Sequence, residues 1–207
     1  LPAGLGRGPL QEPHRAVERS RRGADDGLGD EVALEQRLVR RGQFPLELGV
    51  GLDRDLSAHK VIPRIGCANG LAWSPDSRTM YFTDSHTHFV WAYDFDAARG
   101  EVANRRVFID LTAEDWIVDG STVDAEGNYW LTVPFKGKVL AYDPSGKRIR
   151  TIELPFDLPT CCEFGGENLD VLYVTSATLR RDAAALKGQT KPGGLFAIRG
   201  LGVKGLP

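Results

Sequence analysis

Three small oxygen-bearing residues hold equivalent positions in three repeats of this sequence. Asn69, Asp119 and Thr160 each stand just before a run of strand-forming residues. Side-chain oxygens that converge from separate repeats are the ligands that a hard divalent cation prefers. The pattern has a second explanation, because Asn-Gly and Asp-Gly are also favoured turn dipeptides. The residue types therefore predict either a cation site or a set of turns.

The repeats are defined by two sets of aromatic and β-branched runs, which predict paired strands. The first run of each repeat begins at Tyr81, Tyr129 and Tyr173. Each is followed by a second run, at residues 90–94, 139–143 and 195–199. A period of roughly 40–50 residues with several strands per unit is typical of a β-propeller. In that architecture, equivalent strands of successive blades meet at a common axis, where we expect the three oxygen-bearing residues to lie.

The composition is that of an ordinary soluble globular protein. The chain has 207 residues, of which 42% are hydrophobic and 26% charged, and its net charge is −2. This charge gives no indication of a nucleic-acid partner, and no apolar run is long enough to predict a membrane span. The three cysteines, Cys67, Cys161 and Cys162, show neither a disulfide framework nor a metal-ligand spacing. We therefore expect a cytoplasmic protein.

Residues 1–51 differ in composition from the rest of the chain. Up to residue 50 the sequence contains no Lys, Ile, Trp or Tyr, and Phe44 is its only aromatic residue. Arg, Gly, Pro, Leu and Glu dominate there, a composition that cannot bury much apolar surface. We expect residues 1–51 to be a low-complexity, disordered segment and residues 52–207 to form a partial β-propeller.

The motifs of residues 52–207 resemble the regucalcin/gluconolactonase/luciferin-regenerating (senescence marker protein) family. The resemblance rests on the Asn-Gly-Leu-Ala-Trp-Ser-Pro-Asp run at 69–76, on Asp119-Gly120 with the following strand, and on the Gly165-Gly166 region. These motifs occur in the family's order and spacing. The resemblance implies an all-β fold, a partial six-bladed β-propeller of about three and a half blades with an irregular amino-terminal segment.

The resemblance also implies a site and a reaction. Members of the family hydrolyse sugar lactones and related cyclic esters with one divalent metal ion at the propeller axis. Carried over, the metal ligands are Asn69 and Asp119, with Asp119 also the general base. Calcium is favoured by the oxygen ligands, and zinc or magnesium is plausible. Trp116 and Thr160 are expected to contact a small-molecule lactone substrate.

Two family motifs have no counterpart in this sequence: the Glu ligand in a Glu-Gly-Pro context and the Arg-Phe-Asn-Asp-Gly motif. Two alternatives to a lactonase therefore stay open: a calcium-binding protein without catalysis, and an inactive β-scaffold or interaction module. Open blade edges predict self-association. His86 and His88 are expected to be exposed and inert, because they lie in a connection between strands.

Overall fold

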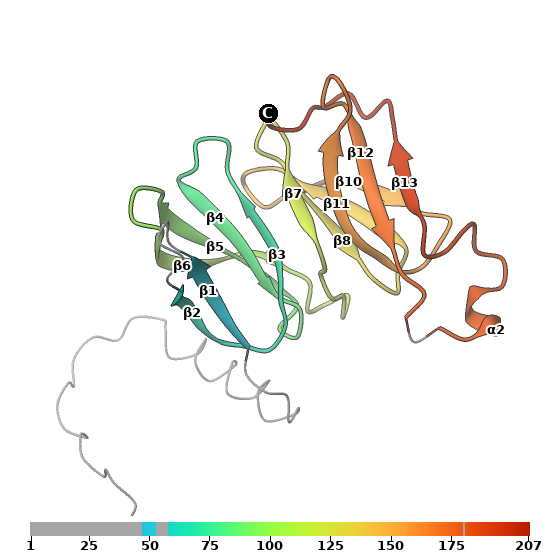
Figure 1. The fold of residues 1–207 in the computed structure, drawn as a ribbon, viewed down its shortest axis with the longest axis horizontal. Helices are drawn as coiled ribbons and strands as arrows, with labels where there is room; N and C mark the ends of the chain where they lie inside the picture. Colours follow the sequence, from blue (N-terminus) through green and yellow to red (C-terminus); the bar gives the residue numbers. More distant parts are fainter. Residues whose placement is uncertain (1–46, 53–57, 180) are drawn as a thin grey trace, which may run out of the picture.

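The structure is a computed structural model that describes residues 47–52, 58–179 and 181–207 (Figure 1). Most of the amino-terminal segment expected at residues 1–51 lies outside the described residues. The predicted fold class is confirmed, because the described residues form antiparallel sheets and one short helix. The helix, α2 (Ala183–Leu186), lies in the connection between the last two strands. No helix in this part of the chain is long and apolar enough to cross a membrane.

The strands form four sheets in chain order. A two-stranded sheet pairs β1 (Glu47–Leu52) with β2 (Ala58–Ile65). The first blade consists of β3 (Ala68–Trp73), β4 (Thr79–Asp84), β5 (Phe89–Asp96) and β6 (Glu101–Asp110). The second blade consists of β7 (Ser121–Val123), β8 (Tyr129–Val133), β9 (Lys138–Tyr142) and β10 (Arg148–Glu153). The third blade consists of β11 (Pro159–Gly165), β12 (Val171–Ser176) and β13 (Leu195–Ile198).

The predicted repeat is the blade. The first runs of the repeat form β4, β8 and β12, and the second runs form β5, β9 and β13, each antiparallel to its predecessor. The first strands of the three blades, β3, β7 and β11, are neighbours in turn, as the inner strands of a propeller are. The boundary expected near Leu52 falls at the end of β1, which is paired with β2.

The core lies between the blades, because the middle strands are buried on both faces. Tyr129, Leu131 and Val133 on β8 pack against the first blade, whereas Trp130 packs against the third. None of these four side chains is more than 1% exposed. Alternate residues of a strand point to opposite faces, so a strand held between two blades needs apolar residues at every position. This explains why the run at 129–133 is apolar apart from Thr132, whose buried hydroxyl donates to the Gly120 carbonyl at 3.0 Å.

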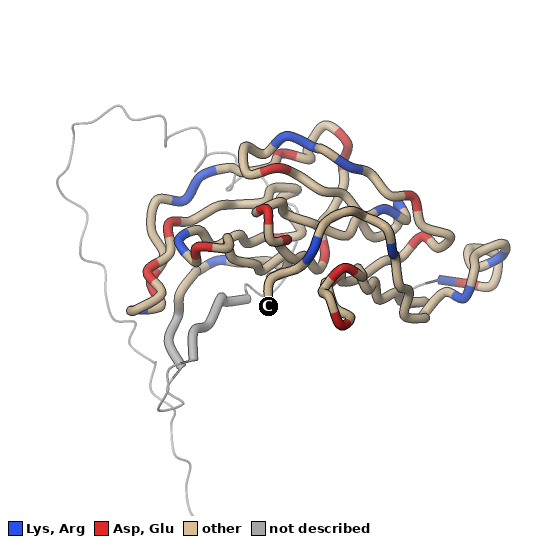
Figure 2. The backbone as a smooth tube through the Cα atoms, turned by 90° about the horizontal axis from the view of Figure 1, so that it is seen from above, with Lys and Arg blue, Asp and Glu red and all other residues tan. Residues whose placement is uncertain are grey.

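Among the predicted site residues, Asn69 lies on β3 and Thr160 on β11, whereas Trp116 and Asp119 lie in the segment between β6 and β7. The β4–β5 turn and the segment between β6 and β7 meet, because Leu111 N–H donates to the His88 carbonyl across 3.0 Å. Basic and acidic positions are mixed along the described backbone (Figure 2). β13 is a sheet edge among the described residues; whether chains associate through it stays a prediction.

Candidate functional site

Asn69 is held at a β-bulge on the inner strand of the first blade. The pairing of β3 with β4 shifts register between Asn69 and Ala72, and Gly70 takes a left-handed φ of 58°. A side chain at position 70 would put its Cβ 2.7 Å from the Tyr129 hydroxyl oxygen, so only glycine fits. The Tyr129 hydroxyl donates to the Gly70 carbonyl at 2.7 Å. Asn69-Gly70 therefore belongs to a strand bulge, a feature that re-aims side chains, and not to a turn.

Asp119 enters the same region from the second blade. Its N–H donates to the Thr132 carbonyl at 3.1 Å, which extends the pairing of β7 with β8 to this residue. The next residue, Gly120, donates its N–H to the Thr160 carbonyl of the third blade at 2.8 Å. The backbone of Asp119 is thus fixed by hydrogen bonds within its own blade and to the neighbouring blade.

Asn69 and Asp119 face each other directly. With the Asn69 amide nitrogen turned toward Ser85 Oγ, at 2.9 Å, its amide oxygen lies 3.1 Å from Asp119 Oδ1. In the opposite orientation the amide nitrogen would donate to Asp119 Oδ1, and the amide oxygen would need a hydrogen from Ser85 Oγ. Ser85 Oγ lies only 2.5 Å from the Val118 carbonyl oxygen, an acceptor, and has one hydrogen to give. The first orientation therefore fits the bonds of Ser85, but it leaves the Asn69 amide oxygen beside two acceptors, Asp119 Oδ1 and, at 3.2 Å, the Ala68 carbonyl oxygen.

Two oxygens at 3.1 Å with no hydrogen between them repel unless a proton or a cation joins them. Half-burial raises the pKa of Asp119 to about 6, against a smaller lowering by a backbone hydrogen bond at Gly120. The carboxylate is thus short of positive charge in its surroundings. Both features fit a divalent cation between an amide oxygen and a carboxylate, ligands of the type that calcium and magnesium prefer.

Among the residues that the structure describes, Asn69 and Asp119 are not accompanied by a cluster of acidic or soft side chains. Among the described residues, no group of three or more His, Cys, Asp or Glu is placed to share a metal ion. Cys161 packs against Gly120, but burial raises the pKa of its thiol, and a protonated thiol is a poor ligand. Asn69 and Asp119 would leave the remaining coordination positions to water, substrate or other residues.

Thr160 contacts the site through its backbone, whereas the ring of Trp116 packs against the core. Thr160 reaches the site with its carbonyl, which binds Gly120, while its hydroxyl lies 2.8 Å from the Thr175 hydroxyl. The ring of Trp116 packs partly buried against the core between the first and second blades. The cationic groups of Lys138 and Arg148 each lie 5.9 Å from that ring. The role of Trp116 in substrate binding stays a prediction.

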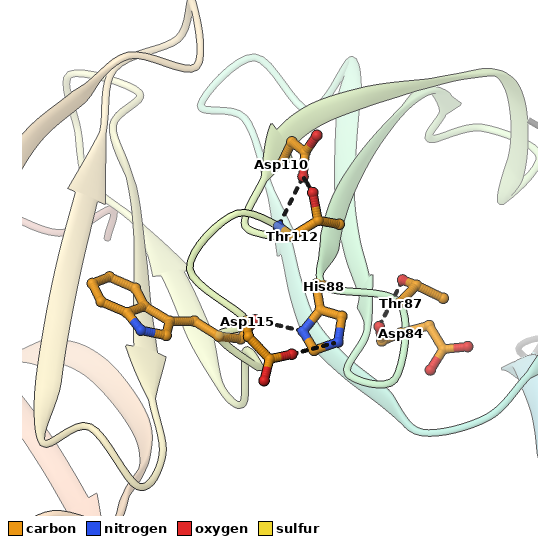
Figure 3. A network of polar contacts seen from close by, with 7 residues as sticks. Asp84, Thr87, His88, Asp110, Thr112 and Asp115 are labelled. Atoms are coloured by element: carbon orange, nitrogen blue, oxygen red, sulfur yellow. Dashed lines mark hydrogen bonds and ion pairs between the residues drawn. The ribbon is translucent and has the colours of Figure 1, made fainter. Parts of the chain in front are cut away.

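The segment that leads to Asp119 is anchored by His88 (Figure 3). His88 Nδ1 lies 3.0 Å from the Trp116 carbonyl, an acceptor, so this nitrogen carries a hydrogen. Nε2 lies 3.6 Å from the Asp115 carboxylate. The expectation that both histidines are exposed is wrong for His88, whose side chain is 21% exposed and links two connections. That neither histidine takes part in the chemistry stays a prediction.

The comparisons with known proteins identify the family of the chain. A family model described as "SMP-30/Gluconolactonase/LRE-like region" matches residues 49–178. The chain belongs to this family. Regucalcin from Gallus gallus is 42% identical over 154 residues, which are 74% of this chain and 52% of the relative.

Two solved structures of the family are similar in fold. One is a luciferin-regenerating enzyme, with a TM-score of 0.71, 33% identity, and coverage of 78% of this chain and 54% of that one. The other is titled a calcium-binding protein, regucalcin, from Agrobacterium tumefaciens, with a TM-score of 0.72, 32% identity, and coverage of 77% and 55%. The chain thus spans about half the length of the relatives that it matches.

Two residues that hold the site were missed by the sequence analysis. Ser85 contacts both Asn69 and the Val118 carbonyl. The Tyr129 hydroxyl donates to the Gly70 carbonyl. Ser85 ends the strand run that begins at Tyr81, and Tyr129 opens the equivalent run in the next repeat. Nothing in either run distinguishes these hydroxyls from packing residues, because their partners lie in other segments of the chain.

Proposed function

We propose that this chain carries the cation-binding part of a lactonase of the gluconolactonase type, which hydrolyses a sugar lactone or related cyclic ester. The observation that carries the proposal is the approach of the Asn69 amide oxygen to the Asp119 carboxylate, at 3.1 Å, from two different blades. Calcium is the ion best suited to this all-oxygen pair, with zinc or magnesium as the other candidates. The family membership of the chain supports the same reaction class.

Asp119 has the properties of a general base for such a reaction. Burial raises its pKa to about 6 when no cation is bound, and a bound cation would favour the ionised carboxylate, which is the form that accepts a proton. A bound divalent cation would supply Lewis-acid polarisation of the ester carbonyl. Asn69 would orient that cation through a neutral oxygen. Asp119 would accept a proton from the water that adds to the carbonyl carbon, and would return it to the ring oxygen as the ring C–O bond breaks, which gives the open hydroxy acid.

Cation binding without catalysis is the second candidate. The regucalcin structure from Agrobacterium tumefaciens is titled a calcium-binding protein, and the chain is 32% identical to it. Asn69 and Asp119 serve either function equally well, because both depend on the same oxygen pair. The two candidates differ only in whether ester hydrolysis follows binding.

The test is a calorimetric titration of the purified full chain with calcium and with zinc. We expect binding by the wild type, loss of binding in Asp119→Ala, and unchanged binding in Glu167→Ala. Glu167 is a matched control because it is an exposed carboxylate in the β11–β12 turn, at the other end of the blade. Acid release from a panel of sugar lactones then separates the two candidates.

Each result has a clear meaning. Binding with hydrolysis that is lost in Asp119→Ala supports the lactonase. Binding without hydrolysis of any lactone supports the calcium-binding protein. An absence of binding in the wild type contradicts both and leaves the inactive β-scaffold.

A further inference from the structure

We propose that Ser85 is a positioning residue that turns the amide oxygen of Asn69 toward Asp119 and fixes the distance between the two. This inference rests on the proposed cation site. Ser85 lies at the end of β4, in the β4–β5 turn of the first blade, and its side chain is buried, with 5% of the residue exposed. It is not a cation ligand in this proposal, since its oxygen is occupied by Asn69.

The hydroxyl of Ser85 joins the two halves of the site. It donates to the carbonyl of Val118, the residue directly before Asp119, at 2.5 Å. It accepts from Asn69 Nδ2 at 2.9 Å. One oxygen atom therefore connects the inner strand of the first blade to the segment that delivers Asp119 from the second.

The direction of these hydrogen bonds is what fixes the amide. A hydroxyl has one hydrogen and two lone pairs. Because the hydrogen of Ser85 is given to the Val118 carbonyl, Ser85 can only accept from Asn69. Only the NH₂ end of the Asn69 amide can donate, so the oxygen end must point the other way, toward Asp119.

The turn that carries Ser85 is itself held in place. The neighbouring Asp84 accepts from the N–H groups of Gly66 and Cys67 at 2.8 and 3.0 Å, and from His86 N–H at 3.2 Å. The Asp84 carbonyl accepts from the Thr87 hydroxyl at 2.8 Å (Figure 3). These bonds fix the turn to the segment just before Asn69, so Ser85 has little freedom to follow the amide if it flips.

Without the Ser85 hydroxyl, we expect the Asn69 amide to rotate so that its nitrogen and oxygen exchange places. In Ser85→Ala the Asn69 nitrogen loses its acceptor, and it can instead donate to Asp119 Oδ1 at 3.1 Å and to the Ala68 carbonyl at 3.2 Å. This orientation removes an oxygen ligand and presents N–H groups to a cation. Loss of a partner that orients a metal ligand typically lowers metal affinity by about 10- to 100-fold.

Two measurements on the full-length chain test the proposal. Calcium titration measures affinity, and NMR of the Asn69 side-chain NH₂ in the absence of metal reports its hydrogen-bond partners. We expect Ser85→Ala to lower calcium affinity by about 10- to 100-fold and to shift both NH₂ resonances. Ser85→Thr keeps a hydroxyl and should restore both. If Ser85→Ala does not fold, Ser85→Cys gives the same test, because a thiol is a weaker donor and acceptor of similar shape.

The matched control is Ser176→Ala. Ser176 ends β12 in the third blade, and its hydroxyl donates to the Gly194 carbonyl at 2.9 Å, with no contact to Asn69. It should change neither readout. Calcium affinity and NH₂ resonances in Ser85→Ala that match those of the wild type would overturn the proposal. If the wild type binds no cation, the proposed function fails, and the NH₂ resonances alone still decide whether Ser85 orients Asn69.

Discussion

At Asp119 two opposing influences set the charge of the site. Burial raises the pKa of its carboxyl to about 6, and the backbone hydrogen bond at Gly120 offsets only part of that rise. Without a cation, folding therefore stabilises the protonated carboxyl of Asp119 relative to the ionised carboxylate. A cation that joins Asp119 to Asn69 would reverse this, because it stabilises the carboxylate.

The raised pKa predicts a pH dependence of stability in the presence of a chelator. The folded state holds the Asp119 proton more tightly than the unfolded state does, so the stabilisation is fully present below pH ~4 and is lost as pH rises through about 6. Asp119→Asn cannot ionise and should escape this loss. Urea unfolding between pH 4 and 7.5 should show the free energy of unfolding of Asp119→Asn rising relative to that of the wild type up to pH ~6.5. Above that pH the difference should be constant. Parallel pH profiles of the two proteins would contradict the raised pKa.

The same proton competes with the cation. Since a metal ligand must be deprotonated, calcium affinity should fall about tenfold per pH unit below the Asp119 pKa. Above pH ~7 it should be flat. A calorimetric titration series across this range measures the effect. An affinity that is independent of pH from 5 to 7 would show that Asp119 is not a ligand.

At the scale of elements, the residue directly before β7 lies so close to β11 that only glycine fits there. A Cβ on Gly120 would lie 2.5 Å from Cys161 Sγ and 2.7 Å from Cys161 Cα. We expect Gly120→Ala to push the second and third blades apart at the site, with a cost of about 1–3 kcal/mol in the free energy of unfolding. Calcium affinity should fall as well, because Asp119 moves with its neighbour.

Gly100→Ala is the matched control for this variant. A Cβ on Gly100 meets no atom within 4 Å, and its φ of 69° costs only the strain of a left-handed alanine, about 1–2 kcal/mol. Calcium affinity should be unchanged in this control. Urea unfolding and calorimetry of both variants make the comparison. Equal calcium affinity in the two variants would mean that the close contact at Gly120 does not position the site.

The elements were the most predictable part of this protein. Runs rich in aromatic and β-branched residues at 81–85, 129–133 and 173–177 predict strands, because these residue types favour strands. Asn69 and Asp119 could be singled out because repeats align them. Ser85 could not, since its bond to Val118 spans 33 residues and depends on how two blades pack. Likewise the bond from Tyr129 to Gly70 spans 59 residues, and only the folded structure brings the two together.

At the scale of the whole molecule, the end of the chain ties two blades together. Residues 201–205 leave the third blade and return to the second, where Ala125 N–H donates to the Lys204 carbonyl at 2.7 Å. Gly205 N–H donates to the Leu169 carbonyl at 2.8 Å, and Gly205 forms a bridge with Asp124. Leu201 packs in the core between these two blades, with 9% of the residue exposed.

This returning segment predicts a large effect of a small deletion. Removing residues 201–207 takes Leu201 from the core that contains Trp130 and Phe164. It also leaves the Ala125 N–H without its acceptor and the Leu169 carbonyl without its donor. Loss of one buried leucine side chain costs about 2–5 kcal/mol, so the free energy of unfolding should fall by at least that amount. Trp130 should become accessible to a fluorescence quencher, because it lies at 1% exposure in the intact chain. Deletion of residues 206–207 alone keeps every contact of the segment described above and should leave both readouts close to those of the full chain. If the longer deletion were equally harmless, the two blades would have to be held together by β7, β8 and β11 alone.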